Sequence, residues 1–284
     1  MMEIKWDEHC SEHMKVKEEA GVTYLSYEKF DEIPWLVHGF STRLGGVSEG
    51  VCSSMNLSFS RGDKEEAVME NYRRIGKAMG FVPENVVTSD QTHTTNVSVV
   101  TSEDCGRGVI YPREFHDVDG LITDDPNVIL ATFYADCVPL YMVDIKKKVI
   151  GLSHSGWRGT VGKIGAVTIK KMVAQFGCDV SDIVVAIGPS ICQACYEVSK
   201  DVIDEFKQVF AECHWSKLFY QKSEEKYQLN LWEANRIIFM EAGIEETHIS
   251  MPGICTCCNP EFLFSHRASQ GKRGNLAAFL GIKA

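Results

Sequence analysis

The sequence predicts an α+β protein in which strands and helices of mixed order build a single domain. Its 284 residues suit one large domain or two small ones. No repeat, low-complexity run or Pro/Ser-rich linker divides the chain. Short β-branched runs alternate along the sequence with segments of helical periodicity. One domain spanning residues 1–284, with a less regular segment over about the first 30, is the simplest organisation.

Strands are predicted where short apolar runs lie between turn residues. Asn127–Asp144 is the most apolar stretch, and we read it as two buried strands broken near Pro139, which cannot donate to a ladder. The predicted strands lie at residues 22–27, in the first part of 35–48, at 85–90, in two segments of 127–144, and at 149–153, 183–187 and 262–267. Residues 275–280 are expected to form a short final element.

Helices are predicted from caps and apolar stripes. Asp63 is a suitable N-cap, with Glu66 at capping-box spacing and Gly80 as the stop. A second helix follows residue 159 and ends at Gly177. Ser199 is expected to cap a third helix. The fourth helix is expected over 231–241.

Charge and cysteine usage narrow the class of protein. The formal net charge is -10, which argues against a general nucleic-acid binder, although local arginines could still bind a small anion. The N-terminus lacks the apolar core of a signal peptide, and no apolar run is long enough for a membrane span. Eleven cysteines, an odd number, do not resemble a disulfide framework. We expect a cytoplasmic protein with reduced thiols and no membrane partner.

Three residues carry the chemistry that the sequence indicates. His93 ends Gln-Thr-His, Cys137 lies in Ala-Asp-Cys-Val-Pro, and His154 opens His-Ser-Gly-Trp-Arg-Gly. Each follows a predicted strand or lies at a break in one. Neutral imidazole and thiolate are ligands that zinc prefers, and three protein ligands are typical of a catalytic zinc with an open position. Spacing alone leaves a second interpretation open, in which the three residues serve separate structural roles.

Nine short segments together resemble the laccase-domain family, the YfiH-type proteins once called polyphenol oxidoreductases and now regarded as zinc-dependent purine nucleoside phosphorylases. They follow one another from about residue 35 to the C-terminus. The segments are His38–Ser48, Asn56-Leu57, Gln91–His93, Val118–Gly120, Ala135–Pro139, His154–Gly159, Ile187–Pro189, Tyr196–Val198 and Phe264–Arg267.

The resemblance implies a layered α/β/β/α fold with mixed sheets packed between helices. It implies that His93, Cys137 and His154 bind Zn²⁺ and form the catalytic centre. It also implies phosphorolysis of adenosine, inosine, guanosine and methylthioadenosine, together with adenosine deamination. Two positions depart from the family pattern: Ser190 stands where many relatives have Cys, and Ala268 where a second Arg is common.

Phosphorolysis needs an anion site, and arginine suits bidentate phosphate binding. Arg43, Arg158 and Arg267 are the candidates, with Asn56 as a further substrate-binding residue; structural ion pairs or loop contacts are the alternative roles of the arginines. Deamination needs a proton shuttle, but the sequence has no HxE or PCxxC signature, so we name none. The partners expected are purine nucleosides and phosphate, and the oligomeric state stays open.

Three other functions are compatible with parts of the sequence. Copper is disfavoured because a multicopper oxidase needs many more histidine ligands, whereas the chain has nine histidines and no HxH pair. A metal-independent cysteine hydrolase could use Cys137 as nucleophile and His154 as base. A non-enzymatic zinc or partner-binding protein is the third possibility.

Two further cysteine groups lie in the C-terminal third. Cys192 and Cys195 form one CxxC pair, and Cys255, Cys257 and Cys258 form a group with the same outer spacing. Two CxxC pairs can build a structural Cys₄ zinc site. Because the intervening segment is long, the sequence favours buried free thiols.

Overall fold

The structure, a computed structural model, describes residues 3–8, 10 and 12–283. The first of its sheets has the strand order β1 (Lys15–Glu19), β2 (Val22–Ser26), β3 (Leu36–Ser41), β15 (Leu276–Ile282), β7 (Ile129–Tyr134), β4 (Val86–Thr88). The second has the order β14 (Ile249–Ser250), β10 (Ile183–Ile187), β8 (Val138–Asp144), β9 (Val149–Ser155), β6 (Gly120–Thr123), β5 (Val97–Val99). A small third sheet has the order β11 (Glu197–Ser199), β13 (Lys226–Leu229), β12 (Phe219–Ser223). The α-helices are α1 (Glu28–Asp31), α2 (Glu65–Met79), α3 (Trp157–Val161), α4 (Ile164–Phe176), α5 (Lys200–Val209), α6 (Trp215–Leu218), α7 (Leu231–Glu241) and α8 (His266–Ser269).

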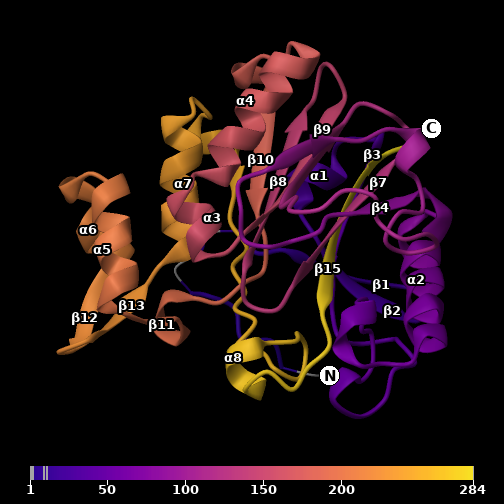
Figure 1. Cartoon of the computed structure of the whole chain (residues 1–284), viewed down its shortest axis with the longest axis horizontal. Helices are drawn as coiled ribbons and strands as arrows, with labels where there is room; N and C mark the ends of the chain where they lie inside the picture. The colour runs from indigo at the N-terminus through magenta and orange to yellow at the C-terminus, as the bar shows by residue number, and fades with distance from the viewer. Residues whose placement is uncertain (1–2, 9, 11, 284) are drawn as a thin grey trace.

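The two large sheets pack face to face, with helices on their outer faces (Figure 1). Strand β8 shows how the sequence builds these layers, because successive side chains of a strand point to opposite faces. Tyr141 and Val143 enter the core between the two sheets. Leu140 and Met142 enter the core beneath the helices. All four side chains are fully buried. Because both faces of β8 are covered, its sequence is a continuous apolar run and does not alternate between apolar and polar residues. The α/β/β/α prediction is confirmed.

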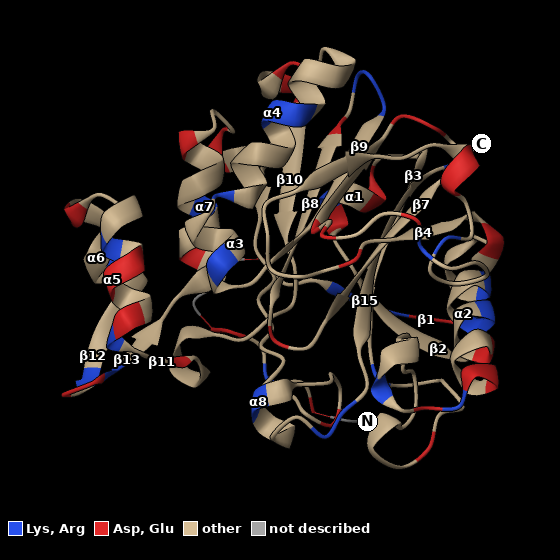
Figure 2. Ribbon diagram, viewed as in Figure 1, with Lys and Arg blue, Asp and Glu red and all other residues tan. Residues whose placement is uncertain are grey.

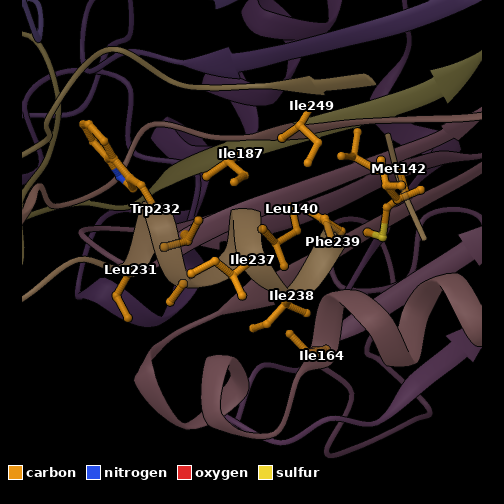
Figure 3. Packing of buried hydrophobic residues seen from close by; sticks show 14 of the residues in the cluster. Leu140, Met142, Ile164, Ile187, Leu231, Trp232, Ile237, Ile238, Phe239 and Ile249 are labelled. Carbon is orange, nitrogen blue, oxygen red and sulfur yellow. The ribbon is translucent and has the colours of Figure 1, made fainter. Parts of the chain in front are cut away.

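Helices α4 and α7 together cover the outer face of the second sheet. Figure 3 shows Phe239 of α7 beside Leu140 of the sheet, whereas Trp232 lies toward the other end of the helix, on the side of Ile187. Helix α7 spans the residues that the sequence predicts. On the opposite side of the molecule, α2 covers the outer face of the first sheet.

The C-terminal ends of two helices follow the predicted chemistry, whereas the predicted N-caps differ. Ser199 stands at the N-cap position of α5, but its side chain makes no capping hydrogen bond. Gly80 and Gly177 adopt left-handed backbones, with φ of 81° and 64°, and end α2 and α4 as expected. The start of α2 differs, because Lys64 rather than Asp63 is the N-cap. The carboxylate of Asp63 instead accepts hydrogen bonds from the backbone of Lys64 and the side chain of Asn56.

Two predicted strands need correction. The break in the apolar stretch falls at residues 135–137, and Pro139 lies inside β8. Pro139 lies opposite His154 of β9, and its carbonyl accepts a hydrogen bond from the Gly188 amide. Residues 262–267 are not a strand: they form turns and enter α8, whose N-cap Ser265 accepts a hydrogen bond from the Ala268 amide. The aromatic run there is buried without joining a sheet.

Regular structure begins before residue 30, since β1 and β2 form an antiparallel hairpin. Figure 2 shows both signs of charge on the exposed helices α2 and α5. Among the described helices, none has the length and apolar character that crossing a membrane requires.

Candidate active site

Three side chains from separate parts of the chain meet where the two large sheets come together. His93 lies in the loop after β4 with φ of 68°, Cys137 in the turn between β7 and β8, and His154 inside β9. One ligand atom from each lies within 4.8 Å of the others. The distance from Cys137 Sγ to His93 Nε2 is 4.0 Å, and the two imidazole centroids are 4.9 Å apart. The structure therefore brings together the three residues that the sequence singles out.

The donor set fits zinc. With ordinary Zn–S and Zn–N bond lengths, a tetrahedral ion would hold a sulfur and a nitrogen about 3.5 Å apart. The observed 4.0 Å needs only a small inward movement of the side chains. The three residues also line a cavity, so a fourth position would face open space rather than a fourth protein ligand. That openness distinguishes a catalytic site from a structural one.

Asp119 organises two of the three residues. Its carboxylate is fully buried and lies 2.7 Å from His154 Nδ1. It also accepts hydrogen bonds from the backbone amides of His93 and Thr94. A carboxylate on Nδ1 fixes the imidazole tautomer and leaves Nε2 of His154 free to bind a metal. The Asp of the Val-Asp-Gly motif is thus a positioning residue that sequence reasoning did not assign.

The electrostatics agree with this geometry. Burial raises the pKa of Asp119, but hydrogen bonds from His154 and from the amides of Thr94 and Thr92 outweigh burial and lower the pKa to about 2. Asp119 is therefore ionised at neutral pH. Its negative charge makes His154 a better electron donor to any bound metal.

Substituting Asp119→Asn should weaken metal binding by about 10- to 100-fold, because the carboxylate that orients His154 is lost. Competition with a chelator, followed by metal analysis, measures the change in affinity. Asp125→Asn is the matched control, since Asp125 accepts backbone hydrogen bonds from Ser102 and Asn127 but does not line the cavity. Equal metal affinity in both variants would show that Asp119 does not position the site.

Cys137 is held as a thiolate. Burial raises its pKa, but the charges and hydrogen bonds of His154 and His93 outweigh burial and lower the pKa to about 6. Burial lowers the pKa of His154, but Cys137 and Asp119 outweigh it and raise the pKa to about 9. A thiolate is the form that binds metal and also the form that acts as a nucleophile. This electrostatic arrangement alone therefore leaves both roles open.

Gly156 has no side chain and so leaves room for His93 and Cys137 to lie close to His154. A Cβ atom at this position would lie 2.9 Å from His93 Cδ2 and 3.2 Å from Cys137 Sγ. The first contact is closer than real Cβ atoms allow, so any side chain would displace His93. The glycine of the His-Ser-Gly-Trp motif is thus required by the close approach of two other motifs.

A cavity of about 530 Å³ opens above the three residues. Phe59 and Phe133 contribute aromatic walls, and Ser58 and Ser60 contribute hydroxyl groups. Three arginines line the same space: Arg61, Arg113 and Arg273.

Two of these arginines have unused donors. Arg113 is paired with Asp90 at 3.3 Å and bonded to the Ser89 carbonyl. In contrast, Nε of Arg61 and Nε of Arg273 are buried without hydrogen-bond partners. Burial and the nearby charge of Arg61 lower the pKa of Arg273 to about 10. Two adjacent, under-paired guanidinium groups in a cavity are a site for an anion.

The arginines expected from the sequence lie elsewhere. Arg43 donates to the carbonyls of Ser53 and Pro260 and packs over the Phe264 ring. Exposed Arg158 packs over the neighbouring Trp157 ring, 4.3 Å from its centroid. Neither lines the cavity next to His93. Their part in substrate binding stays a prediction.

Arg267 and Asn56 also lie outside the cavity wall. Arg267 donates to the carbonyls of Cys195 and Glu197, and its amide donates to Asp136. Asn56 is fully buried, and its carbonyl oxygen accepts from the amides of Ser58 and Asn275. Because Ser58 and Asn275 line the cavity, Asn56 shapes its wall from behind.

Known proteins resemble this chain in sequence over most of its length. The family model described as "Multi-copper polyphenol oxidoreductase laccase" matches residues 37–283. The protein named purine nucleoside phosphorylase YlmD from Bacillus subtilis (strain 168) is 38% identical over 252 residues, which cover 87% of this chain and 89% of the relative.

Solved structures of relatives have the same fold. The hypothetical protein YfiH of Bacillus licheniformis superposes with a TM-score of 0.89 at 33% identity, covering 94% of this chain and 99% of that one. YlmD from Geobacillus stearothermophilus superposes with a TM-score of 0.86 at 35% identity, covering 95% and 99%.

Proposed function

Because this chain belongs to the multicopper polyphenol oxidoreductase laccase family, whose relative in Bacillus subtilis is named a purine nucleoside phosphorylase, we propose that it catalyses the same class of reaction. Its substrates are adenosine, inosine, guanosine and methylthioadenosine, its co-substrate is phosphate, and its metal is zinc. A second activity is the deamination of adenosine. Purine nucleosides and phosphate are its partners, in a reducing, cytoplasmic compartment that agrees with its free thiols.

One observation supports this proposal above all: a cluster of possible metal ligands and a group of under-paired arginines line the same cavity. His93, Cys137 and His154 lie on one part of its wall. Arg61 and Arg273, with their unpartnered Nε atoms, lie on another. A nucleoside and a phosphate must meet in such a space for phosphorolysis, and binding both in a defined orientation removes much of the entropic barrier.

The chain's own residues then have distinct tasks. Arg61 and Arg273 hold the phosphate, whose oxygen forms the new bond to C1′ of the ribose as the bond from C1′ to the purine breaks. The purine leaves with the electron pair of that bond and takes up the proton that hydrogen phosphate brings. Phe59 and Phe133 give the flat purine apolar surfaces. Asp119 holds His154 through Nδ1. A bound zinc ion would supply Lewis acidity and lower the pKa of a bound water to about 7.

Zinc suits the site better than a set of copper ions. Within the described part of the chain, the potential metal clusters are the His93–Cys137–His154 group and a group of four cysteines. Together they offer two histidines, whereas a multicopper oxidase needs many imidazole ligands. Three protein ligands with an open side are typical of catalytic zinc, and thiolate and imidazole are both ligands that zinc takes.

A cysteine hydrolase is the second candidate, and it has a specific observation in its favour. Cys137 and His154 have the lowered and raised pKa values of a thiolate–imidazolium pair, at about 6 and about 9. This function predicts activity that survives the removal of metal. A binding protein without catalysis is less well supported, because the cluster opens onto a cavity instead of closing around a fourth ligand.

Product analysis tests the proposal. Incubation of the protein with adenosine and phosphate should give adenine and ribose 1-phosphate, and omission of phosphate should stop their formation. Deamination should give inosine and ammonia without phosphate, because water is then the reactant. Chelation of the metal should stop both reactions. If no nucleoside is consumed by zinc-loaded protein, or if turnover is unchanged after the metal is removed, the proposed function is wrong.

A further inference from the structure

A second cluster of side chains that could bind a metal ion lies apart from the cavity, on two loops of the C-terminal half. Cys192 and Cys195 come from the loop after β10, and Cys255 and Cys258 from the loop after β14. The four sulfur atoms all lie within 4.8 Å of one another. Cys195 Sγ is 3.4 Å and Cys192 Sγ is 3.9 Å from Cys258 Sγ. Loops separated by some 60 residues thus place two CxxC pairs against each other.

These distances match a metal site. In a tetrahedral zinc site with Zn–S bonds of about 2.3 Å, neighbouring sulfur atoms are about 3.8 Å apart. The distances of 3.4 and 3.9 Å lie on either side of this value. They are far longer than the ~2.05 Å of a disulfide. We propose that Cys192, Cys195, Cys255 and Cys258 bind one zinc ion as a second, structural metal site.

The backbone around the cluster is organised for ligation. The amide of Cys192 donates to Cys255 Sγ at 3.2 Å, which stabilises negative charge on that sulfur. The loops are joined by a β-bridge between Ser190 and Cys255 and by a hydrogen bond from the Thr256 amide to the Ser190 carbonyl. The backbone therefore sets the distance between the two cysteine pairs without any metal.

The surroundings indicate a structural role. Cys255 is buried, and the other three cysteines are half-buried against the core under the helices. Four protein ligands leave no open position for a substrate. Unlike the His93 cluster, these cysteines do not line the cavity. The ion would hold the two loops together, as zinc does in small metal-stabilised domains.

The same two loops support the residue before Cys137. The hydroxyl of Thr256 donates to the Asp136 carboxylate at 2.7 Å. The amide of Ile191 donates to the Asp136 carbonyl at 3.0 Å. Thr256 follows one proposed ligand, and Ile191 precedes another. Loss of the second zinc is therefore expected to loosen the turn that carries Cys137.

Metal analysis of the full-length protein, purified under reducing conditions, tests the proposal. Wild type should hold about two zinc ions per chain, and Cys258→Ser should lose about one of them. Cys213→Ser is the matched control, because Cys213 is exposed and lies outside both clusters, so it should keep both ions. Unchanged zinc content in Cys258→Ser, iron in place of zinc, or disulfides among the four cysteines in the intact wild-type protein would overturn the assignment.

A measurement on the wild-type protein tests the proposal even if the Cys258→Ser variant fails to fold. X-ray absorption at the zinc edge should show mostly sulfur neighbours at about 2.3 Å, because the Cys₄ site adds four sulfurs to the single sulfur of the other site. A shell dominated by nitrogen and oxygen would contradict the proposal. The outcome does not depend on the proposed reaction, because Cys137→Ser should lose the other zinc ion and keep this one.

Discussion

His93→Ala should lose the zinc ion of the cavity and nucleoside phosphorolysis together. The substitution removes one of three ligands, and His93 has no other task in the proposed reaction. Because a catalytic metal contributes several kcal/mol to barrier lowering, and about 1.4 kcal/mol corresponds to tenfold in rate, we expect a fall in kcat/KM on the order of 1000-fold. Steady-state kinetics and metal analysis on the same preparation measure the two effects.

The same variant distinguishes the zinc mechanism from a mechanism in which Cys137 is the nucleophile. A Cys137–His154 dyad does not need His93, so a hydrolase would keep much of its activity. Cys137→Ser should remove metal and activity together under the zinc hypothesis, but activity alone under the nucleophile hypothesis. His116→Ala is the control, because His116 is exposed, with 81% of its side chain accessible, and lies outside the metal-type clusters. Full turnover in His93→Ala would refute the three-ligand site.

Arg273→Ala and Arg61→Ala should each raise the KM for phosphate by about 10- to 100-fold, as expected when a charge-assisted hydrogen bond worth roughly 1.5–3 kcal/mol is lost. The reason is that both arginines line the cavity and that the Nε atom of each is buried without a hydrogen-bond partner. Deamination of adenosine uses no phosphate and should change much less. Initial rates over a range of phosphate concentrations separate the two reactions.

Arg73→Ala on α2 is the matched control, since Arg73 is exposed and its ion pair within the described residues is with the surface residue Glu70. Arg43→Ala and Arg158→Ala compare the two hypotheses directly. The sequence predicts that they weaken phosphate-dependent cleavage, whereas their contacts lie outside the cavity. If the cavity variants keep the wild-type KM for phosphate and the other two do not, the anion site lies at Arg43 and Arg158.

The metal cluster could be predicted because its signal is local. His93, Cys137 and His154 each lie in a short motif at a strand end or break, and family resemblance links the motifs. Helix α7 was equally predictable, because an apolar stripe with a glycine after it defines both its face and its end. In each case a few neighbouring residues specify the result.

The remaining features depend on contacts between distant segments. Arg61 and Arg273 are separated by more than 200 residues, and neither lies in one of the resembling motifs, so only tertiary packing shows that they share a cavity. An arginine beside a glycine in each loop was the only local signal. The four cysteines were expected as separate buried thiols for the same reason, since sequence separation does not show that two loops are joined by a β-bridge. The strand predicted at 262–267 failed because buried aromatic residues in a turn resemble a strand in composition.

The position of the cavity cluster links ligand binding to global stability. His93 follows a strand of the first sheet, His154 belongs to the second, and Cys137 lies in the turn that joins them. The unfolded chain cannot hold these three groups together, so by mass action an ion bound there favours the docked sheets. At a free concentration 100 times the Kd, such binding adds about 2.7 kcal/mol to the free energy of unfolding. The melting temperature of this protein should therefore rise with free zinc concentration, and apparent affinity should fall as denaturant separates the sheets.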